Sequence, residues 1–325
     1  MRIAIIGGSG FVGSRLISLL QTIPDSKLLN IDKQPSKLCP DITEIADVLD
    51  VRKLTELLVG IEVVVLLAAE HRDDVTPTSL YYKVNVEGMH NTLHAMKSNG
   101  ISRLIFTSSV AVYGLNKSNP TELHPTDPFN DYGHSKWQAE CALQRWYTTH
   151  QDWNINILRP TVIFGEDNRG NVYNLLRQIT SGRFLMVGTG ENRKSMAYVG
   201  NVVSFITFLI ENSRQGYNVF NYIDKPDFTM NDLIYHVGNA LNKHIPTVRF
   251  PYWLGVFGGY GFDLFARNTR KKLSVSSVRV KKFCAVTQFD SVRLQESGFK
   301  PTFTLEEGLT RTLQYEFGFE DKKSY

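Results

Sequence analysis

Short apolar runs alternate with longer amphipathic stretches along the first half of the chain. The apolar runs are residues 2–6, 28–32, 61–69, 104–107 and 155–158. Helical patterns of apolar residues cover residues 52–59, 80–99 and 132–149. Strands that alternate with helices form a doubly wound parallel sheet. The pattern therefore predicts an α/β fold.

The pattern becomes less regular after Pro160, where glycines at positions 165, 170, 188 and 190 punctuate loops. A chain of 325 residues is longer than one typical domain, and 42% of hydrophobic residues is enough for a large core. We therefore expect a Rossmann-like domain over residues 1–160. A smaller second domain is expected mainly over residues 161–325, with some segments of that half returning to the first domain.

A glycine-rich turn, Gly7-Gly-Ser-Gly10-Phe-Val-Gly13, joins the first apolar run to a helix start. Glycines let a backbone approach a dinucleotide pyrophosphate closely, and the helix amino terminus then offers unpaired N–H groups and a favourable dipole. The spacing is Gly-x-x-Gly-x-x-Gly rather than Gly-x-Gly-x-x-Gly, so the turn alone is weak evidence. The candidate cofactor residues of this turn are Gly7, Gly10, Phe11, Val12 and Gly13.

The second apolar run ends in a carboxylate, Asp32, nineteen residues after Gly13. Such an acid accepts hydrogen bonds from a ribose 2′-hydroxyl and repels a 2′-phosphate, which favours NAD over NADP. The adjacent Lys33 weakens this contrast and is included among the cofactor residues. The simpler interpretation is an acidic surface residue after a strand, which the complete order of strand, turn, helix, strand and acid disfavours.

Tyr132-Gly-His-Ser-Lys136 places a phenol and an amine four residues apart on a predicted helix, so both lie on one face. A phenol with an ordinary pKa of about 10 is a poor base at neutral pH, and a neighbouring lysine cation favours its phenolate. Ser109, twenty-three residues upstream, can hold a substrate oxygen while the tyrosine exchanges its proton. These three are the candidate catalytic residues, although a Tyr-x-x-x-Lys spacing also arises by chance.

Composition and charge argue against several other classes of function. The formal net charge of +4 is too small to indicate nucleic acid binding, and no nucleic-acid motif accompanies it. Cys39, Cys141 and Cys284 are isolated, so we expect reduced thiols and neither a disulfide framework nor a metal site. The first apolar run is too short for a signal peptide, and residues 202–210 are too few to span a membrane.

Further segments occur in an order that is typical of a known family: residues 7–13, Asp32, Asp47-Val48, Leu67-Ala68-Ala69, Asn85-Val-Glu-Gly88, Thr107-Ser-Ser109, Val112-Tyr-Gly114, residues 132–136, Leu158-Arg-Pro160 and Phe164-Gly165. With these residues the chain resembles the extended short-chain dehydrogenase/reductase family of sugar-nucleotide epimerases and dehydratases over essentially its whole length. The resemblance implies that Tyr132 is the base or acid, that Lys136 activates it and binds the nicotinamide ribose, and that Ser109 hydrogen-bonds the reacting oxygen. It also implies further cofactor residues: Asp47 and Val48 at the adenine, Leu67, Ala68, Ala69, Asn85 and Ser108 along the cofactor, and Pro160 and Val162 near the nicotinamide.

The two residues that follow Ser109 indicate which reaction of the family this chain catalyses. Dehydratases of the family have Asp-Glu there, whereas this chain has Val110-Ala111, and apolar side chains cannot transfer the protons that elimination requires. The remaining reactions are 4-epimerisation of a sugar and one-way reduction of a 4-keto sugar by NAD(P)H. Asp32 favours NAD over NADP, and an epimerase regenerates its NAD within each turnover. Asp32 therefore favours epimerisation over reduction. A dinucleotide-binding sensor stays open, but such proteins usually lose the tyrosine or the lysine, and this chain keeps both.

A narrower resemblance rests on residues 68–75, 113–117, 165–173, 194–199 and 276–284. These segments are similar to bacterial 4-epimerases of the family that act on GlcNAc linked to undecaprenyl diphosphate, at the start of O-antigen assembly. The resemblance implies reversible conversion of the lipid-linked GlcNAc to GalNAc through a 4-keto intermediate. Epimerases of UDP-GlcNAc are the alternative, because both groups need the same chemistry at C4.

The same resemblance implies residues that contact the substrate. Arg72 and Ser109 are candidates, together with Asn171, Arg193 and Lys194 in segments that bind a nucleotide diphosphate in relatives. One departure from the family pattern is Asn201, which stands where an aspartate is expected after Tyr-Val-x. We expect this change to alter the packing of a loop.

A basic and aromatic segment favours the lipid-linked substrate. Residues 249–282 contain eight Lys or Arg and one acid, Asp263, and seven aromatic residues lie between 250 and 265. This composition is typical of a segment on an anionic membrane surface. A buried apolar helix followed by a solvated basic face is the simpler alternative. With the resemblance, we expect peripheral attachment to the cytoplasmic face of the bacterial inner membrane, and a homodimer formed through a helix pair that includes residues 132–136.

Overall fold

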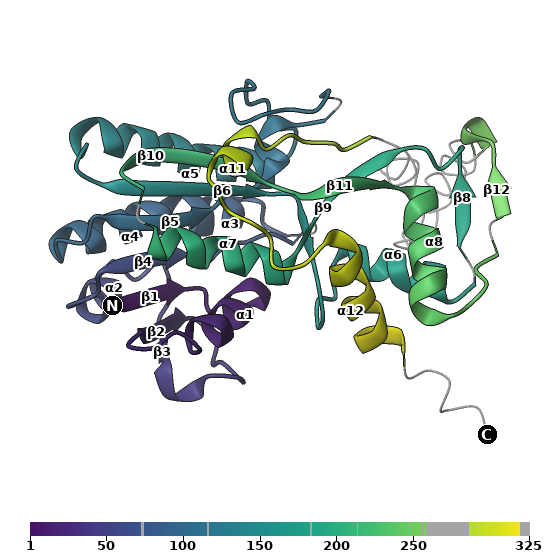
Figure 1. Cartoon of the computed structure of the whole chain (residues 1–325). Helices are drawn as coiled ribbons and strands as arrows, with labels where there is room; N and C mark the ends of the chain where they lie inside the picture. Colours follow the sequence, from purple (N-terminus) through teal and green to yellow (C-terminus); the bar gives the residue numbers. More distant parts are fainter. Residues whose placement is uncertain are drawn as a thin grey trace. The chain divides into compact units, whose positions relative to one another are not determined.

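The computed structural model describes residues 1–72, 75–115, 117–182, 184–212, 214–246, 248–254, 257 and 286–318. The chain divides into two compact units, of which the first comprises Met1–Ile163, Ala197–Ile223 and Phe289–Phe303. A sheet of order β10-β6-β5-β4-β1-β2-β3 forms this unit, and its described neighbours all pair in parallel (Figure 1). Its strands are β1 (Arg2–Ile6), β2 (Lys27–Asp32), β3 (Thr43–Ile45), β4 (Val63–Leu66), β5 (Arg103–Thr107), β6 (Asn154–Pro160) and β10 (Gly216–Tyr222). The predicted doubly wound parallel fold is confirmed.

The strand order reverses between β4 and β1. From β1 the chain runs outward through β2 and β3, and it then returns to β4 and runs outward on the other side through β5 and β6. In open parallel sheets, ligands bind beyond the carboxyl ends of the strands at such a reversal. The glycine turn follows β1 and Leu67 follows β4, so both sequence motifs flank this position.

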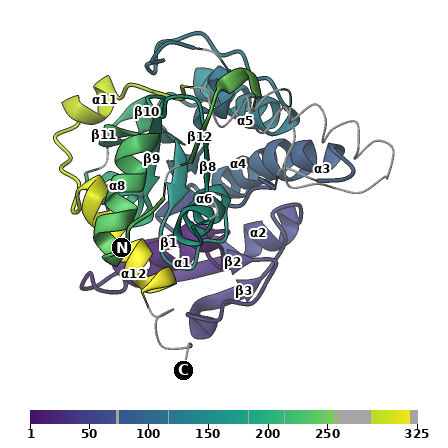
Figure 2. The same ribbon diagram turned by 90° about the vertical axis from the view of Figure 1, so that its right-hand side faces the viewer.

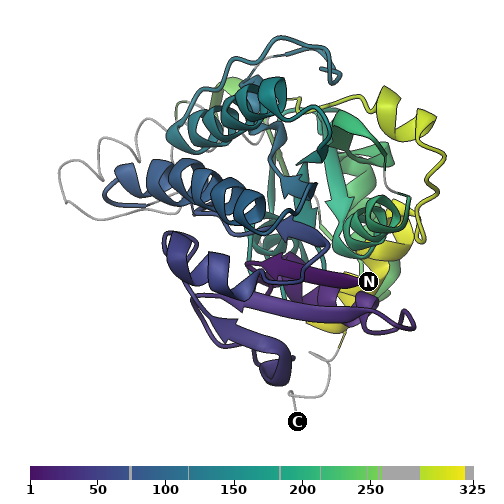
Figure 3. The same ribbon diagram turned by 90° about the vertical axis from the view of Figure 1, so that its left-hand side faces the viewer.

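Helices cover both faces of the sheet. On one face lie α2 (Val51–Leu57), α4 (Gly88–Ser98) and α5 (Asp131–Thr149), which form one layer in Figures 2 and 3. On the other face α1 (Phe11–Leu20) packs against α7 (Val199–Glu211). Shorter helical segments of this unit are α3 (Ser79–Tyr82), the π-helical η2 (Lys83–Glu87), the 3-10 helices η1 (Pro40–Ile42) and η3 (Val110–Tyr113), and α11 (Val292–Glu296).

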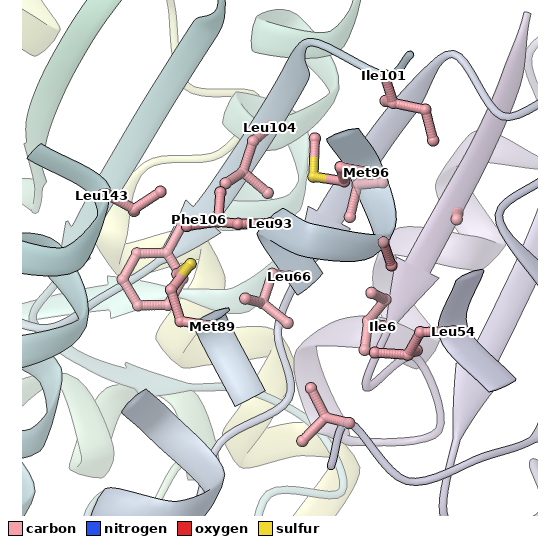
Figure 4. Close-up of a cluster of buried hydrophobic side chains, with 14 of the residues drawn as sticks. Ile6, Leu54, Leu66, Met89, Leu93, Met96, Ile101, Leu104, Phe106 and Leu143 are labelled. Carbon is pink, nitrogen blue, oxygen red and sulfur yellow. The ribbon is translucent and has the colours of Figure 1, made fainter. Parts of the chain in front are cut away.

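A continuous apolar layer holds α2, α4 and α5 on the sheet. Side chains alternate along a strand, so Leu104 and Phe106 of β5 point to the same face. Figure 4 shows them beside Met89 and Leu93 of α4 and Leu143 of α5, and all five are at most 1% exposed. This packing fixes the helix that carries Tyr132 and Lys136 on the sheet.

The second unit comprises Phe164–Met196, Asp224–Gln288 and Thr304–Tyr325. Within it α12 (Leu305–Phe317) packs on α8 (Met230–Leu241) and on α6 (Asn171–Thr180). Strand β8 (Leu185–Val187) pairs in parallel with β12 (Val248–Phe250), and β9 (Arg193–Tyr198) pairs antiparallel with β11 (Asp224–Thr229). The last two belong to a three-stranded sheet of order β11-β9-β7, where β7 is Val162–Phe164.

Some sequence features fall outside the described residues. These are Cys284, most of the basic and aromatic segment, the whole of segment 276–284, and parts of the segments 68–75 and 113–117. Cys39 and Cys141 are free thiols. No helix in the described ranges combines the length and the apolar character that a membrane span requires.

Candidate active site

The glycine turn lies where β1 and β4 are adjacent. Gly7 has a φ of +92°, and a Cβ added to it would lie 2.4 Å from the backbone nitrogen of Ala68. A Cβ on Gly13 would lie 2.5 Å from the Cα of Gly8. These two positions therefore need glycine for the turn itself. A Cβ added to Gly10 would lie 3.4 Å from the carbonyl oxygen of Gly7, which is an ordinary contact. The space beside Gly10 is therefore open, and a ligand can approach the backbone there.

The start of α1 is suited to an anion. Gly10 is its N-cap residue, no side chain caps the helix, and its first turn contains no acid. The N–H groups at Phe11 and Val12 therefore combine with the helix dipole to favour a negatively charged group. Together with the room at Gly10, this geometry fits the pyrophosphate of a dinucleotide.

Asp32 ends β2 beside the glycine turn. Its Oδ2 accepts a hydrogen bond of 3.0 Å from the Ser9 N–H, and its Oδ1 accepts one of 3.0 Å from the Gln34 N–H. A carboxylate has about four lone-pair positions, so these two bonds leave acceptor capacity for ribose hydroxyls. Lys33 is exposed.

Asp32→Asn is expected to lower the preference for NAD over NADP by about tenfold, because hydrogen bonds to a charged group contribute roughly 1.5–3 kcal/mol and the repulsion of a 2′-phosphate is lost. Calorimetric titration of nucleotide-free protein with each nucleotide measures this ratio. Asp41→Asn, at an exposed position of η1, is the matched control. An unchanged ratio in Asp32→Asn would show that another residue selects the cofactor.

The remaining predicted cofactor residues lie at the ends of strands of the first unit. The N–H groups of Leu67 and Ala68 both donate to the Ile6 carbonyl, at 2.8 Å. Ala69 follows them and is half-buried, as are Leu67 and Ala68. The other positions are as follows: Asp47 is exposed, Val48 is buried, Pro160 ends β6 and is buried, and Val162 begins β7 and is 40% exposed.

Helix α5 presents Tyr132 and Lys136 on one face. Its N-cap residue is Asn130, whose Oδ1 accepts a hydrogen bond of 2.9 Å from the Gly133 N–H. Tyr132 is half-buried, and its ring centroid lies 6.3 Å from that of Tyr81. Lys136 is 2% exposed, and its Nζ donates to the Thr107 carbonyl at 2.9 Å and lies 4.9 Å from the centroid of the Phe106 ring. The amine is therefore fixed at the carboxyl end of β5.

The environment of Lys136 shifts its proton equilibrium. Burial lowers the pKa of Lys136 to about 7, and the negative charge of Glu140, one turn further along α5, acts in the opposite direction. An amine with such a pKa changes its charge near neutral pH.

Ser109 lies two residues beyond Thr107, so the chain brings it to the same end of β5 as Lys136. It is the N-cap of η3, and its Oγ accepts a hydrogen bond of 3.1 Å from the Ala111 N–H. This bond uses an oxygen lone pair, so the hydroxyl hydrogen remains for a substrate oxygen. Ser109, Lys136 and Tyr132 are thus carried by two elements that β5 holds together.

Asn85 has a structural role that its motif did not indicate. It is buried in η2, where its Oδ1 accepts from the Glu70 N–H at 2.9 Å and its Nδ2 donates to the Ser135 Oγ at 2.8 Å and to the Glu70 carbonyl. It therefore ties the loop after β4 to the helix that carries the tyrosine. Its predicted contact with the cofactor stays a prediction.

Arg72, a predicted substrate residue, pairs with Glu70. Its Nε lies 3.1 Å from Oε1 of the carboxylate. Burial alone would raise the pKa of Glu70, but the hydrogen bonds and charge of Arg72 hold that pKa below its ordinary value. Ser109 belongs to the first unit, as Arg72 does. The other three predicted substrate residues belong to the second unit: Asn171 begins α6, and Arg193 and Lys194 begin β9.

Asn201, the departure from the family pattern, is a buried clamp. Its Nδ2 donates to the Phe303 carbonyl at 2.7 Å and its Oδ1 accepts from the Phe303 N–H at 2.9 Å. An ionised aspartate could accept the second bond but could not donate the first. The amide therefore fixes the loop before α12 with two bonds.

Two charged residues of the core were not predicted from the sequence. Glu140 and Arg159 are 1% and 5% exposed and form a buried ion pair. A sequence signal was present, because Arg159 directly follows a buried apolar run and such a charge needs a buried partner. No group of three or more His, Cys, Asp or Glu within the described ranges is arranged to hold a metal ion.

The parallel sheet, the glycine turn and Asp32 are the features of a dinucleotide-dependent enzyme, and Tyr132, Lys136 and Ser109 remain its predicted catalytic residues. The chain belongs to the NAD dependent epimerase/dehydratase family, whose model matches residues 3–222. This membership confirms the predictions of an enzyme and of NAD as its cofactor.

Individual relatives agree with the family assignment. The chain is 58% identical to the N-acetyl-alpha-D-glucosaminyl-diphospho-ditrans,octacis-undecaprenol 4-epimerase of Escherichia coli O157:H7, over 97% of this chain and 95% of that protein. It is 28% identical to the UDP-glucose 4-epimerase of Vibrio cholerae, over 96% of this chain and 94% of that protein. Among solved structures, a UDP-glucuronic acid 4-epimerase from Bacillus cereus in complex with NAD has a TM-score of 0.76 at 19% identity, covering 97% of this chain and 98% of that chain. The last comparison supports the fold alone.

Proposed function

We propose that this protein catalyses the reversible 4-epimerisation of GlcNAc-diphospho-undecaprenol to GalNAc-diphospho-undecaprenol in the biosynthesis of O-antigen or a related surface polysaccharide. The observation that carries the proposal is the 58% identity, over nearly the whole chain, to an enzyme with that substrate in its name. The first unit would hold NAD, and the second would supply most contacts to the substrate.

In this proposal the chemistry is oxidation and re-reduction at C4. Bound NAD supplies the acceptor, and later the donor, of one hydride. Tyr132 as phenolate takes the proton of the C4 hydroxyl, Lys136 favours that phenolate, and Ser109 donates a hydrogen bond to the C4 oxygen. The 4-keto sugar then turns over in the site. Hydride returns to the opposite face of C4 and Tyr132 returns the proton, so a hydroxyl is inverted without net oxidation.

The simplest test of the reaction class follows the cofactor. We expect purified protein to convert the lipid-linked GlcNAc without added NADH and with no net change of absorbance at 340 nm. A 4-keto sugar reductase would instead consume one NADH for each sugar, and a dinucleotide-binding sensor would convert nothing. Either of these results would overturn the epimerase assignment.

Exposed aromatic residues support a peripheral place at the cytoplasmic face of the inner membrane. We define the apolar patch as Tyr252, Trp253, Leu254 and Phe257, which are 50%, 61%, 41% and 70% exposed. Most of residues 249–282, including seven of their eight basic residues, lies outside the described part of the chain. Large apolar side chains exposed beside a basic sequence are suited to an anionic bilayer that contains the polyprenyl substrate.

Trp253→Ala combined with Phe257→Ala is expected to lower binding to phosphatidylglycerol-containing vesicles by about tenfold, because each ring buries apolar surface in the bilayer. Co-sedimentation with these vesicles measures the bound fraction. A double replacement of Leu123 and Tyr235 by Ala, at positions 80% and 66% exposed, is the matched control and should bind as the wild type does. Equal binding of all three proteins would contradict the membrane role of the patch.

Four residues are candidates for contacts with the substrate. Arg72, Asn171, Arg193 and Lys194 are proposed to contact the diphosphate or the sugar. Of these, Arg193 donates to the Asp227 carbonyl at 3.1 Å, and Asn171 is exposed. A homodimer through a helix pair that includes α5 remains an expectation from the family.

A further inference from the structure

Glu140 and Arg159 form a buried ion pair one helical turn beyond Lys136. The Arg159 Nε donates to the Glu140 Oε1 and Oε2 at 3.0 and 3.2 Å, and its Nη2 donates to Oε2 at 2.5 Å. Glu140 belongs to α5 and Arg159 to β6. Tyr132, Lys136 and Glu140 follow one another at intervals of four residues, so they share one face of α5.

The ion pair holds both ends of the segment that contains Ser109. At one end, the Ser108 Oγ donates to the Glu140 Oε1. At the other end, the Arg159 Nη1 donates to the Tyr113 hydroxyl at 2.6 Å, and this hydroxyl donates to the Asn221 Oδ1 at 2.8 Å. Tyr113 is fully buried. Ser109 lies between the two ends, at the start of η3.

Stability alone does not account for this arrangement. A buried ion pair loses much of its attraction to desolvation, and well-packed apolar residues in its place are often equally stable. The polar bonds do, however, define one position for the backbone between Ser108 and Tyr113. A small error in the position of a group that contacts the reacting atoms can lower a rate by about 10²-fold.

We infer that Tyr113, held by the Glu140–Arg159 pair, is a positioning residue that fixes Ser109 for its hydrogen bond to the C4 oxygen of the substrate. Tyr113 itself touches neither substrate nor cofactor in this role, and it acts through the η3 backbone. The inference rests on the proposed epimerase function, because the hydrogen bond from Ser109 to the C4 oxygen is part of that proposal.

Tyr113→Phe tests the inference, because it removes the hydroxyl and keeps the ring. We expect kcat to fall about tenfold with less than about a twofold change in KM, since the bond from Ser109 strengthens as charge develops on the oxygen. Tyr147→Phe is the matched control and should keep the wild-type rate, because Tyr147 is a half-buried tyrosine of α5 that packs on the apolar layer between α4, α5 and the sheet, away from Tyr113.

A double-mutant cycle separates positioning from a general loss of structure. If Tyr113 acts through Ser109, Tyr113→Phe lowers kcat in the wild type but has no further effect in Ser109→Ala. Equal fold losses in both backgrounds, or a higher KM at unchanged kcat, would overturn the inference. Ser108→Ala, which releases the other end of the segment, provides a second cycle with the same expectation should Tyr113→Phe fail to fold.

The cycle is run on GlcNAc-diphospho-undecaprenol and on UDP-GlcNAc, and it is read on the substrate that the wild-type protein epimerises. Turnover of UDP-GlcNAc alone would contradict the proposed substrate, while the cycle on that sugar would still decide the role of Tyr113. A wild type that epimerises neither sugar would overturn both the proposed function and the inference.

Discussion

Tyr132→Phe is expected to lower epimerisation by roughly 10²- to 10⁴-fold, the range that a positioned acid or base contributes. The ring of Tyr132 packs beside Tyr81, and phenylalanine preserves that contact while removing the only atom that can exchange the proton. Turnover of the lipid-linked sugar measures the loss. NAD binding should persist, because the glycine turn and Asp32 belong to other elements.

The control for this prediction is again Tyr147→Phe on the same helix. It removes an identical hydroxyl fifteen residues further along α5 and should leave turnover unchanged. Retention of more than about a tenth of the activity by Tyr132→Phe would assign the proton transfer to another group.

Lys136→Met is expected to lower kcat/KM by about 10²- to 10³-fold, as the loss of one oriented donor does in other active sites. Methionine keeps the unbranched apolar stem of the lysine, one atom shorter, but lacks the cation that favours the phenolate of Tyr132 and the hydrogen bond to the Thr107 carbonyl. Turnover and NAD affinity should both fall. Lys53→Met, at a lysine of α2 whose side chain is 42% exposed, is the matched control.

Lys136→Met should also change the dependence of stability on pH. The folded protein holds Lys136 with a pKa of about 7, whereas the unfolded chain has an ordinary lysine. Between these two pKa values the unfolded chain binds more protons, so this residue makes the stability of the wild type rise with pH above about 7. We expect the variant to lose that rise in urea unfolding of NAD-free protein. An equally steep rise in Lys136→Met would show that the amine does not carry the linkage.

The sheet and the glycine turn could be predicted because their sequence signals are local. An apolar run followed by glycines and a helix start depends on neighbours within a few residues, and each of these elements occurs where the pattern placed it. The predicted helix at residues 80–99 is not a single regular α-helix in the structure. Its first part contains a π-helical segment, in which Asn85 is directed to partners fifteen and fifty residues away.

The supports of the site could not be predicted because they depend on distant partners. The Glu140–Arg159 pair joins a helix to a strand nineteen residues later, and Tyr113 meets Asn221 across 108 residues. Sequence spacing alone shows that Glu140 shares a face with Tyr132, but not that a buried arginine faces it. The sequence shows that Asn201 departs from the family pattern. Its two hydrogen bonds to Phe303 could not be predicted, because the two residues are 102 positions apart.

The most direct test of the proposed function gives the purified protein radiolabelled GlcNAc-diphospho-undecaprenol in membranes and, separately, UDP-GlcNAc. No NADH is added, and the hexosamine released by mild acid is identified. We predict that labelled GalNAc forms from the lipid-linked sugar. GalNAc formed from UDP-GlcNAc alone would contradict the account and would identify a 4-epimerase of soluble sugar nucleotides.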